Sequence, residues 1–112
     1  MVSPHQPIVA ALGDDVILPS HLNPNTSAVS VTLEWTRPDL KPRFVYVRQG
    51  RRELLHLQNP AFTGRTSLFI EELQNGNVSL KLSNVKISDT GTYRCFLPAM
   101  KIEASVQLVV GK

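Results

Sequence analysis

The fold is decided by the stretch Asp89-Thr90-Gly91-Thr92-Tyr93-Arg94-Cys95 and by Trp35, which lies 60 residues before the cysteine. A tyrosine two residues before a cysteine, directly after an Asp-x-Gly corner, is typical of a strand in a two-sheet β-sandwich. The tyrosine hydroxyl then bonds back to the corner backbone, and a tryptophan from another strand packs beside the cysteine. We therefore expect Trp35, Tyr93 and Cys95 to belong to the core, and Gly91 to occupy a tight turn that favours a residue without a Cβ.

The rest of the 112-residue chain also has the pattern of an all-β protein. Short segments alternate apolar and polar residues, Pro, Gly, Asn and Asp separate them, and no segment keeps a helical period. Residues 1–112 are expected to form one domain, a sandwich of two antiparallel sheets with Greek-key connections. The expected strands begin at Ile8 and cover residues 16–20, 31–36, 44–49, 54–58, 65–70, 78–82, 92–97 and 104–110. Asn75-Gly76 is expected to form a hairpin turn.

Arg65 and Asp89 are the candidates for an ion pair that closes one end of the sandwich. Arg65 begins an expected strand, and Asp89 lies at the corner before the strand that carries Cys95. Because the guanidinium fork matches a carboxylate, we predict a bidentate contact. The alternative is a pair of unrelated surface charges, and a large separation between the two charged groups would support it.

The formal net charge of +3 is modest, but positive residues are concentrated in one segment. Six of them fall between residues 37 and 52, where Asp39 is the only acid: Arg37, Lys41, Arg43, Arg48, Arg51 and Arg52. A solvated hairpin is the favoured interpretation, and the alternative is a patch that attracts an acidic protein surface or anionic lipid headgroups. Nucleic acid is not an expected partner, because no basic motif interleaved with aromatic residues accompanies the charge.

Neither catalysis, metal binding nor a cofactor is expected. A lone thiol can act as a nucleophile when a neighbouring histidine or helix dipole lowers its pKa. Cys95, however, is expected to face the core beside Trp35, and His5, His21 and His56 share no spacing that implies a site. The apolar stretches are strand-sized, shorter than the roughly 20 residues that span a bilayer.

Several segments resemble one known family: Pro-Ile-Val-Ala-Ala-Leu-Gly-Asp-Asp-Val-Ile-Leu-Pro over 7–19, Gly-Arg-Thr over 64–66, Gly-Asn-Val-Ser-Leu-Lys-Leu over 76–82, and Ser-Asp-Thr-Gly over 88–91 with Cys95-Phe96. They are similar to the butyrophilin and myelin oligodendrocyte glycoprotein group, whose fold is the immunoglobulin variable-type sandwich. The resemblance covers nearly the whole chain. An antigen-receptor variable domain is disfavoured, because residues 102–110 lack the Phe-Gly-x-Gly or Trp-Gly-x-Gly bulge.

The resemblance implies a disulfide that this chain cannot form. Family members carry Leu-Pro-Cys where this sequence has Leu18-Pro19-Ser20, so Cys95 has lost its partner. A bridge between positions 20 and 95 would close a loop of about 75 residues, which the chain-entropy model values at roughly 4.5 kcal/mol. We interpret Ser20 as an engineered or selected replacement that the remaining core packing tolerates.

The resemblance also implies an extracellular, N-terminal domain of a type I membrane glycoprotein related to the costimulatory ligands of T cells, with its membrane anchor outside these 112 residues. In these families one sheet face commonly binds a protein receptor. Alternation along the expected strands assigns this face to Glu34, Thr36, Arg94 and Phe96, flanked by Arg43, Tyr46, Met100 and Lys101. Phe96 beside Arg94 matches the residue types of interface hot spots.

Two further expectations concern modification and the choice of partner. Asn25-Thr26-Ser27 and Asn77-Val78-Ser79 match the N-glycosylation pattern, which favours a secretory route. The alternative function is homophilic adhesion, in which the same face binds a second copy of the chain on an opposing membrane. A dimer that depends on concentration would favour adhesion, and a persistent monomer would favour a separate receptor.

Overall fold

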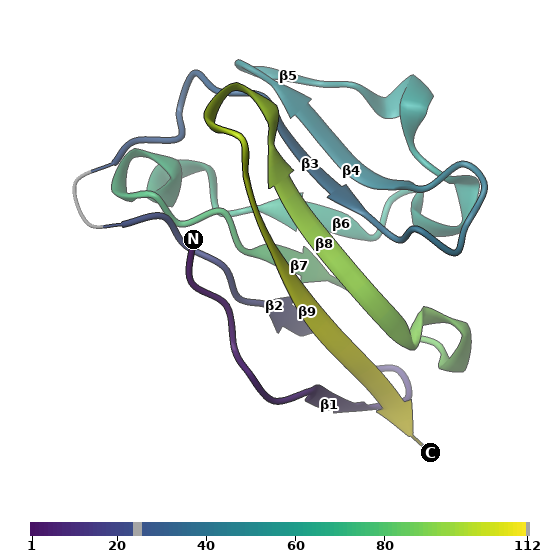
Figure 1. Ribbon diagram of the computed structural model, residues 1–112. Coiled ribbons are helices and arrows are strands. Elements are labelled where there is room, and N and C mark those ends of the chain that lie inside the picture. The colour runs from purple at the N-terminus through teal and green to yellow at the C-terminus, as the bar shows by residue number, and fades with distance from the viewer. Residues whose placement is uncertain (24–25, 112) are drawn as a thin grey trace.

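The computed structural model describes residues 1–23 and 26–111, and it places the strands in two sheets (Figure 1). One sheet has six strands in the order β1-β9-β8-β3-β4-β5, and the other has three in the order β2-β7-β6. The strands are β1 Ile8–Ala11, β2 Val16–Leu18, β3 Leu33–Thr36, β4 Phe44–Gln49, β5 Arg52–Glu53, β6 Thr66–Leu68, β7 Leu80–Leu82, β8 Gly91–Leu97 and β9 Ile102–Gly111. The predicted all-β sandwich is confirmed.

Strand β8 lies in the middle of the six-stranded sheet, where it pairs antiparallel with β3 on one side and with β9 on the other. Strand β1 is parallel to β9, and it places the N-terminal segment at the edge of this sheet. Short 3-10 helices occupy several connections: η1 Leu55–Leu57, η2 Pro60–Phe62, η3 Ile70–Asn75, η4 Ile87–Asp89 and η5 Pro98–Met100. In the described residues no helix is long and apolar enough to cross a membrane.

The core lies between the two sheets and is built from alternate residues of each strand. Val16 and Leu18 of β2, and Leu33 and Trp35 of β3, are buried while the residues between them are more exposed. The Trp35 indole donates a hydrogen bond of 3.0 Å to the Val78 carbonyl oxygen, which joins the six-stranded sheet to the segment that leads into β7. The indole therefore buries its ring and satisfies its one polar group.

The prediction of a strand at residues 54–58 is wrong. The two-residue strand β5 comes earlier, and η1 follows it. The Gln58 side chain explains the change, because its amide donates to the Val45 carbonyl oxygen at 2.8 Å and to the Thr66 hydroxyl at 2.9 Å. This side chain bridges β4 and β6, and the chain passes between the sheets without a further strand pairing.

The prediction of a hairpin turn at Asn75-Gly76 is also wrong. Strands β6 and β7 pair antiparallel, but the six-residue helix η3 connects them. Gly76 ends this helix with φ of 83°, and its amide donates to the Leu73 carbonyl oxygen. A Cβ at Gly76 would lie 2.7 Å from the Thr26 carbonyl oxygen, so glycine is required by close approach as well as by backbone angle. The Asn-Gly pair marks the end of a helix here, because glycine is also the common residue just after a helix, where the backbone turns left-handed.

Candidate protein-binding face

The predicted bidentate contact between Arg65 and Asp89 is present at the corner before β8. Arg65 donates through Nη1 to Asp89 Oδ2 at 2.7 Å and through Nη2 to Oδ1 at 2.9 Å. Burial alone would raise the pKa of Asp89, but the hydrogen bonds from Arg65 and from the Lys86 amide hold that pKa below its usual value. The Arg65 guanidinium also lies over the Phe62 ring at 5.4 Å. The pair therefore closes this end of the sandwich in its charged form.

Tyr93 has the position and the contact that its spacing predicts. It is fully buried, and its hydroxyl donates to the Asp89 carbonyl oxygen at 2.5 Å. Burial raises the pKa of Tyr93 to about 12, so the hydroxyl stays protonated and remains a donor. Gly91 is the first residue of β8 and its φ is not positive, so the expected need for a residue without a Cβ comes from packing and not from the backbone angle. A Cβ there would lie 2.8 Å from Nε of Arg37, so Gly91 makes room for a packed guanidinium.

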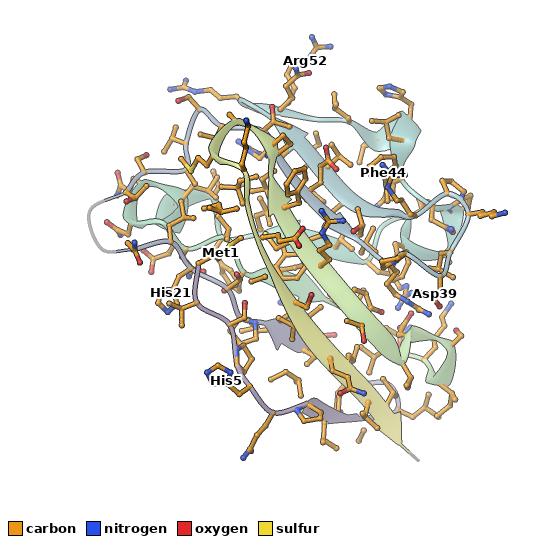
Figure 2. All side chains as sticks on the ribbon, viewed as in Figure 1. Met1, His5, His21, Asp39, Phe44 and Arg52 are labelled. Atoms are coloured by element: carbon orange, nitrogen blue, oxygen red, sulfur yellow. The ribbon has the colours of Figure 1, made fainter. Side chains whose placement is uncertain are left out.

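The basic segment is not one solvated hairpin, because two of its members are buried. Arg37 is 5% exposed; it pairs with Asp39 at 2.6 Å and donates to the Ser88 carbonyl oxygen at 2.9 Å. Arg48 is 8% exposed. Figure 2 shows that Arg52, in contrast, points away from the molecule at β5. The exposed charge is thus smaller than the sequence suggests, and it is divided between the two ends of β4.

Ser20 and Cys95 are both buried, as the pattern predicts. Cys95 is a free cysteine, and burial raises the pKa of its thiol, which keeps it protonated and unreactive. The Ser20 hydroxyl accepts a hydrogen bond from the Ser3 hydroxyl at 3.1 Å, and the Ser20 amide donates to Ser79 Oγ at 3.0 Å. Sequence reasoning missed both serine partners, since they are distant in the chain.

The outward surface of the six-stranded sheet is the candidate face, and the strand register defines it. Glu34 of β3 lies opposite Phe96 of β8 and opposite Val47 of β4. In the next outward row, Thr36 lies opposite Arg94 and Phe44. Because directly paired residues point to the same side of a sheet, these residues share the surface that faces away from Trp35. We call this surface the outer face: Glu34, Thr36, Phe44, Val47, Arg94, Phe96 and Glu103.

The assignment of Tyr46 to this face is wrong. A β-bulge shifts the register of β4, so that Trp35 lies opposite Tyr46 while Thr36 lies opposite Phe44. Tyr46 therefore turns inward and belongs to the core cluster at 1% exposure. Its hydroxyl is buried and finds no hydrogen-bond partner among residues 1–23 and 26–111, and burial raises the pKa of Tyr46 to about 12. Simple alternation could not find the bulge, because no residue in this segment marks it.

Two aromatic rings on the outer face each carry an arginine above them. The Arg94 guanidinium carbon lies 4.8 Å from the Phe96 ring centre, and that of Arg43 lies 4.9 Å from the Phe44 ring centre. Arg94 also forms an ion pair with Glu103, and its side chain remains 39% exposed. Each arginine thus covers part of an apolar ring and keeps its charge near the surface.

Two of the remaining predicted members of the face, Thr36 and Met100, are less exposed than expected. Thr36 is on the outer face but only 3% exposed, and its hydroxyl donates to the Arg94 carbonyl oxygen at 3.5 Å. Met100 in η5 is half-buried and packs against the core cluster, whereas Lys101 beside it is exposed. Phe44, Val47 and Glu103 were missed, although Phe44 lies two residues before Tyr46 and alternation from the outward position assigned to Tyr46 would have included it. Figure 2 shows Phe44 on the β4 side of the sheet.

The two candidate glycosylation sites differ in what can be said of them. Asn25 lies outside the described residues. Asn77 is half-buried, and its side-chain oxygen accepts a hydrogen bond from the Ser79 amide at 3.1 Å. In the part of the chain that the structure describes, no three His, Cys, Asp or Glu side chains come together as metal ligands.

The family model described as the immunoglobulin V-set domain matches residues 3–110. The chain is 36% identical over 96 residues to human butyrophilin subfamily 1 member A1, covering 86% of this chain and 18% of that protein. It is 34% identical over 112 residues to myelin-oligodendrocyte glycoprotein from Macaca fascicularis, covering 98% and 45%. The crystal structure of bovine butyrophilin superimposes with a TM-score of 0.86 at 35% identity, covering 96% of this chain and 52% of that one. The chain thus spans less than half the length of both sequence relatives.

Proposed function

Because the chain belongs to the immunoglobulin V-set family, we propose that it is an extracellular recognition domain of a membrane-anchored protein, and that it binds a protein receptor on another cell. The similarity to butyrophilin supports a place among the immune-regulatory ligands of the T-cell costimulatory type. The binding surface is the outer face, and the domain has no chemistry of its own. The buried, protonated thiol of Cys95 supports the absence of catalysis.

One observation carries this proposal: the outer face presents Phe96 and Phe44, each half-buried and each stacked under an arginine. Interface hot spots are enriched in aromatic residues and arginine, and they contribute favourable binding free energy when a partner excludes water from them. Phe96 and Arg94 lie on the central strand β8, so a partner that covers the sheet would desolvate both. The surrounding Glu34 and Glu103 supply polar groups for a rim.

The test is a binding screen against a library of cell-surface receptors. Residues of the outer face are then substituted, and the binding of each receptor found in the screen is measured again. We expect Phe96→Ala and Arg94→Ala each to weaken binding at least tenfold, which corresponds to about 1.4 kcal/mol. Ile17→Ala and Lys81→Ala are the matched controls, because both side chains are exposed on the three-stranded sheet. Circular dichroism and thermal unfolding establish that all four variants are folded.

The controls also decide between outcomes. Loss of binding with Ile17→Ala but not with Phe96→Ala would move the interface to the opposite sheet and contradict the proposal. If no receptor is found, analytical ultracentrifugation tests a second copy of the chain as the partner. A concentration-dependent dimer that Phe96→Ala disrupts would replace receptor binding with adhesion through the same face.

A further inference from the structure

The segment Asn77-Val78-Ser79 is an N-glycosylation acceptor sequence that lies between η3 and β7. Asn77 Oδ1 accepts the Ser79 amide hydrogen, so the side chain folds back on its own backbone two residues on, as in an Asx-turn. Within residues 1–23 and 26–111, no group accepts a hydrogen bond from Asn77 Nδ2, and this nitrogen is not among the buried polar atoms without a partner. Asn77 is half-buried, so part of the residue stays accessible to solvent.

The rest of the acceptor sequence is closed off once the domain has folded. Val78 is fully buried; its amide donates to the Ser20 carbonyl oxygen at 3.0 Å, and its own carbonyl oxygen accepts the Trp35 indole hydrogen. The Ser79 hydroxyl is the acceptor for the Ser20 amide at 3.0 Å and donates to the Ser20 carbonyl oxygen at 3.3 Å. An enzyme that must hold the serine hydroxyl beside the asparagine amide cannot reach it in this state.

We propose that Asn77 carries an N-linked glycan, and that the glycan is attached before Ser20 and Trp35 close around Val78 and Ser79. This proposal rests on the extracellular location proposed above. The donor is an oligosaccharide on a polyprenyl diphosphate. A bond forms between Nδ2 and the anomeric carbon of the first sugar, the bond from that carbon to the diphosphate oxygen breaks, Nδ2 loses one proton, and the lipid diphosphate leaves.

The fold gives the glycan a place where it does not obstruct the outer face. Asn77 forms an isolated bridge with His21, so the two residues are neighbours. Asn77 also leads into β7 of the three-stranded sheet, whereas the outer face belongs to the six-stranded sheet, and Figure 2 shows His21 and Phe44 on different sides of the molecule. The glycan therefore extends from the end of the sandwich where η3 lies, and it leaves Phe44 and the strands around it open.

The test is site mapping on the full chain secreted from mammalian cells behind a supplied signal sequence. Trypsin releases residues 66–81, which contain Asn77 as their only acceptor. Removal of the glycan by peptide N-glycosidase in ¹⁸O-labelled water converts Asn77 to labelled Asp, and fragmentation of the peptide distinguishes this position from Asn75, which can deamidate spontaneously. We expect labelled Asp at position 77 in most molecules, and loss of one glycan from the intact mass of Asn77→Gln. An unmodified 66–81 peptide from the secreted protein would overturn the proposal.

The timing is tested with purified oligosaccharyltransferase and its lipid-linked donor. We expect transfer to the synthetic peptide 66–81, and at least tenfold slower transfer to the folded chain produced in bacteria. Equal rates would overturn the order of events. Receptor binding is a separate measurement, so a glycosylated domain that binds nothing would count against the proposed function alone, and an unglycosylated domain that binds would count against this inference alone.

Discussion

At the scale of single residues, the Arg65–Asp89 pair makes the free energy of unfolding depend on pH in the acidic range. The pKa of Asp89 is lower in the folded protein than in the unfolded chain, where it is about 3.9, so the pair contributes fully above that pH and its contribution is lost as pH falls through the folded pKa. We expect Asp89→Asn to lower the free energy of unfolding by about 3 kcal/mol at pH 7, because it leaves the Arg65 charge in a partly buried site.

Urea unfolding of the wild type and of Asp89→Asn at pH 7 and pH 3 measures this difference. The gap between the two proteins should shrink at the lower pH, where Asp89 begins to take up a proton. Asp15→Asn is the control, since Asp15 is 57% exposed and lies 4.0 Å from Lys81, a geometry worth about 0 to 1 kcal/mol. A gap of the same size at both pH values would show that the charge of Asp89 is not the stabilising factor.

Position 20 offers the second prediction at this scale. Ser20→Cys is expected to form a disulfide with Cys95 on oxidation and to raise the unfolding midpoint, with an upper bound of about 4.5 kcal/mol from chain entropy. The gain will fall short of that bound because the change removes the hydroxyl that Ser3 now contacts. Thiol titration and intact mass report the bridge, and Ser20→Ala serves as the variant that lacks both groups. Two titratable thiols remaining after oxidation would refute the pairing.

At the scale of elements, the bulge in β4 has a measurable consequence at Tyr46. The bulge points the Tyr46 side chain into the core, where its hydroxyl has no hydrogen-bond partner in the described part of the chain, whereas the Tyr93 hydroxyl donates to the Asp89 carbonyl oxygen. We expect Tyr46→Phe to raise the free energy of unfolding by up to about 1 kcal/mol, and Tyr93→Phe to lower it by about 1 to 3 kcal/mol. Thermal and urea unfolding of both variants supply the comparison. Equal destabilisation by the two changes would mean that Tyr46 has a hydrogen bond after all.

The elements also show how far the sequence could be interpreted. Alternation found the core sides of β2, β3, β8 and β9, because each is a regular strand with one buried side. It failed at β4, where one extra residue reverses the outward and inward positions, and it failed at η1 and η3, where side-chain and backbone contacts from distant segments replace strand pairing. Phe96 was found because β8 is regular, whereas Tyr46 was misplaced and Val47 was missed because β4 is not. Ser3 and Ser79 could not be linked to Ser20 before the topology was known.

At the scale of the whole molecule, the two sheets have different roles in the proposals: the six-stranded sheet presents the outer face, and the glycan leaves the molecule elsewhere. Glu103→Asn tests this division, because it creates the acceptor Asn-Ala-Ser over 103–105 beside Arg94 and Phe96. Glycosylated Glu103→Asn is expected to lose receptor binding, while the wild type with its Asn77 glycan retains it. Glu103→Gln removes the same ion pair with Arg94 without adding sugar, and it should keep most of the binding.

Enzymatic removal of the sugar completes this experiment. Peptide N-glycosidase leaves Asp at position 103, which restores a carboxylate near Arg94 as well as access to the face. Binding measured by surface plasmon resonance before and after the treatment should therefore return, and intact mass establishes that the glycan was present and then removed. If the glycosylated variant binds as well as the wild type, the receptor contacts another part of the sandwich, since a branched oligosaccharide on β9 cannot coexist with a protein seated over Phe96.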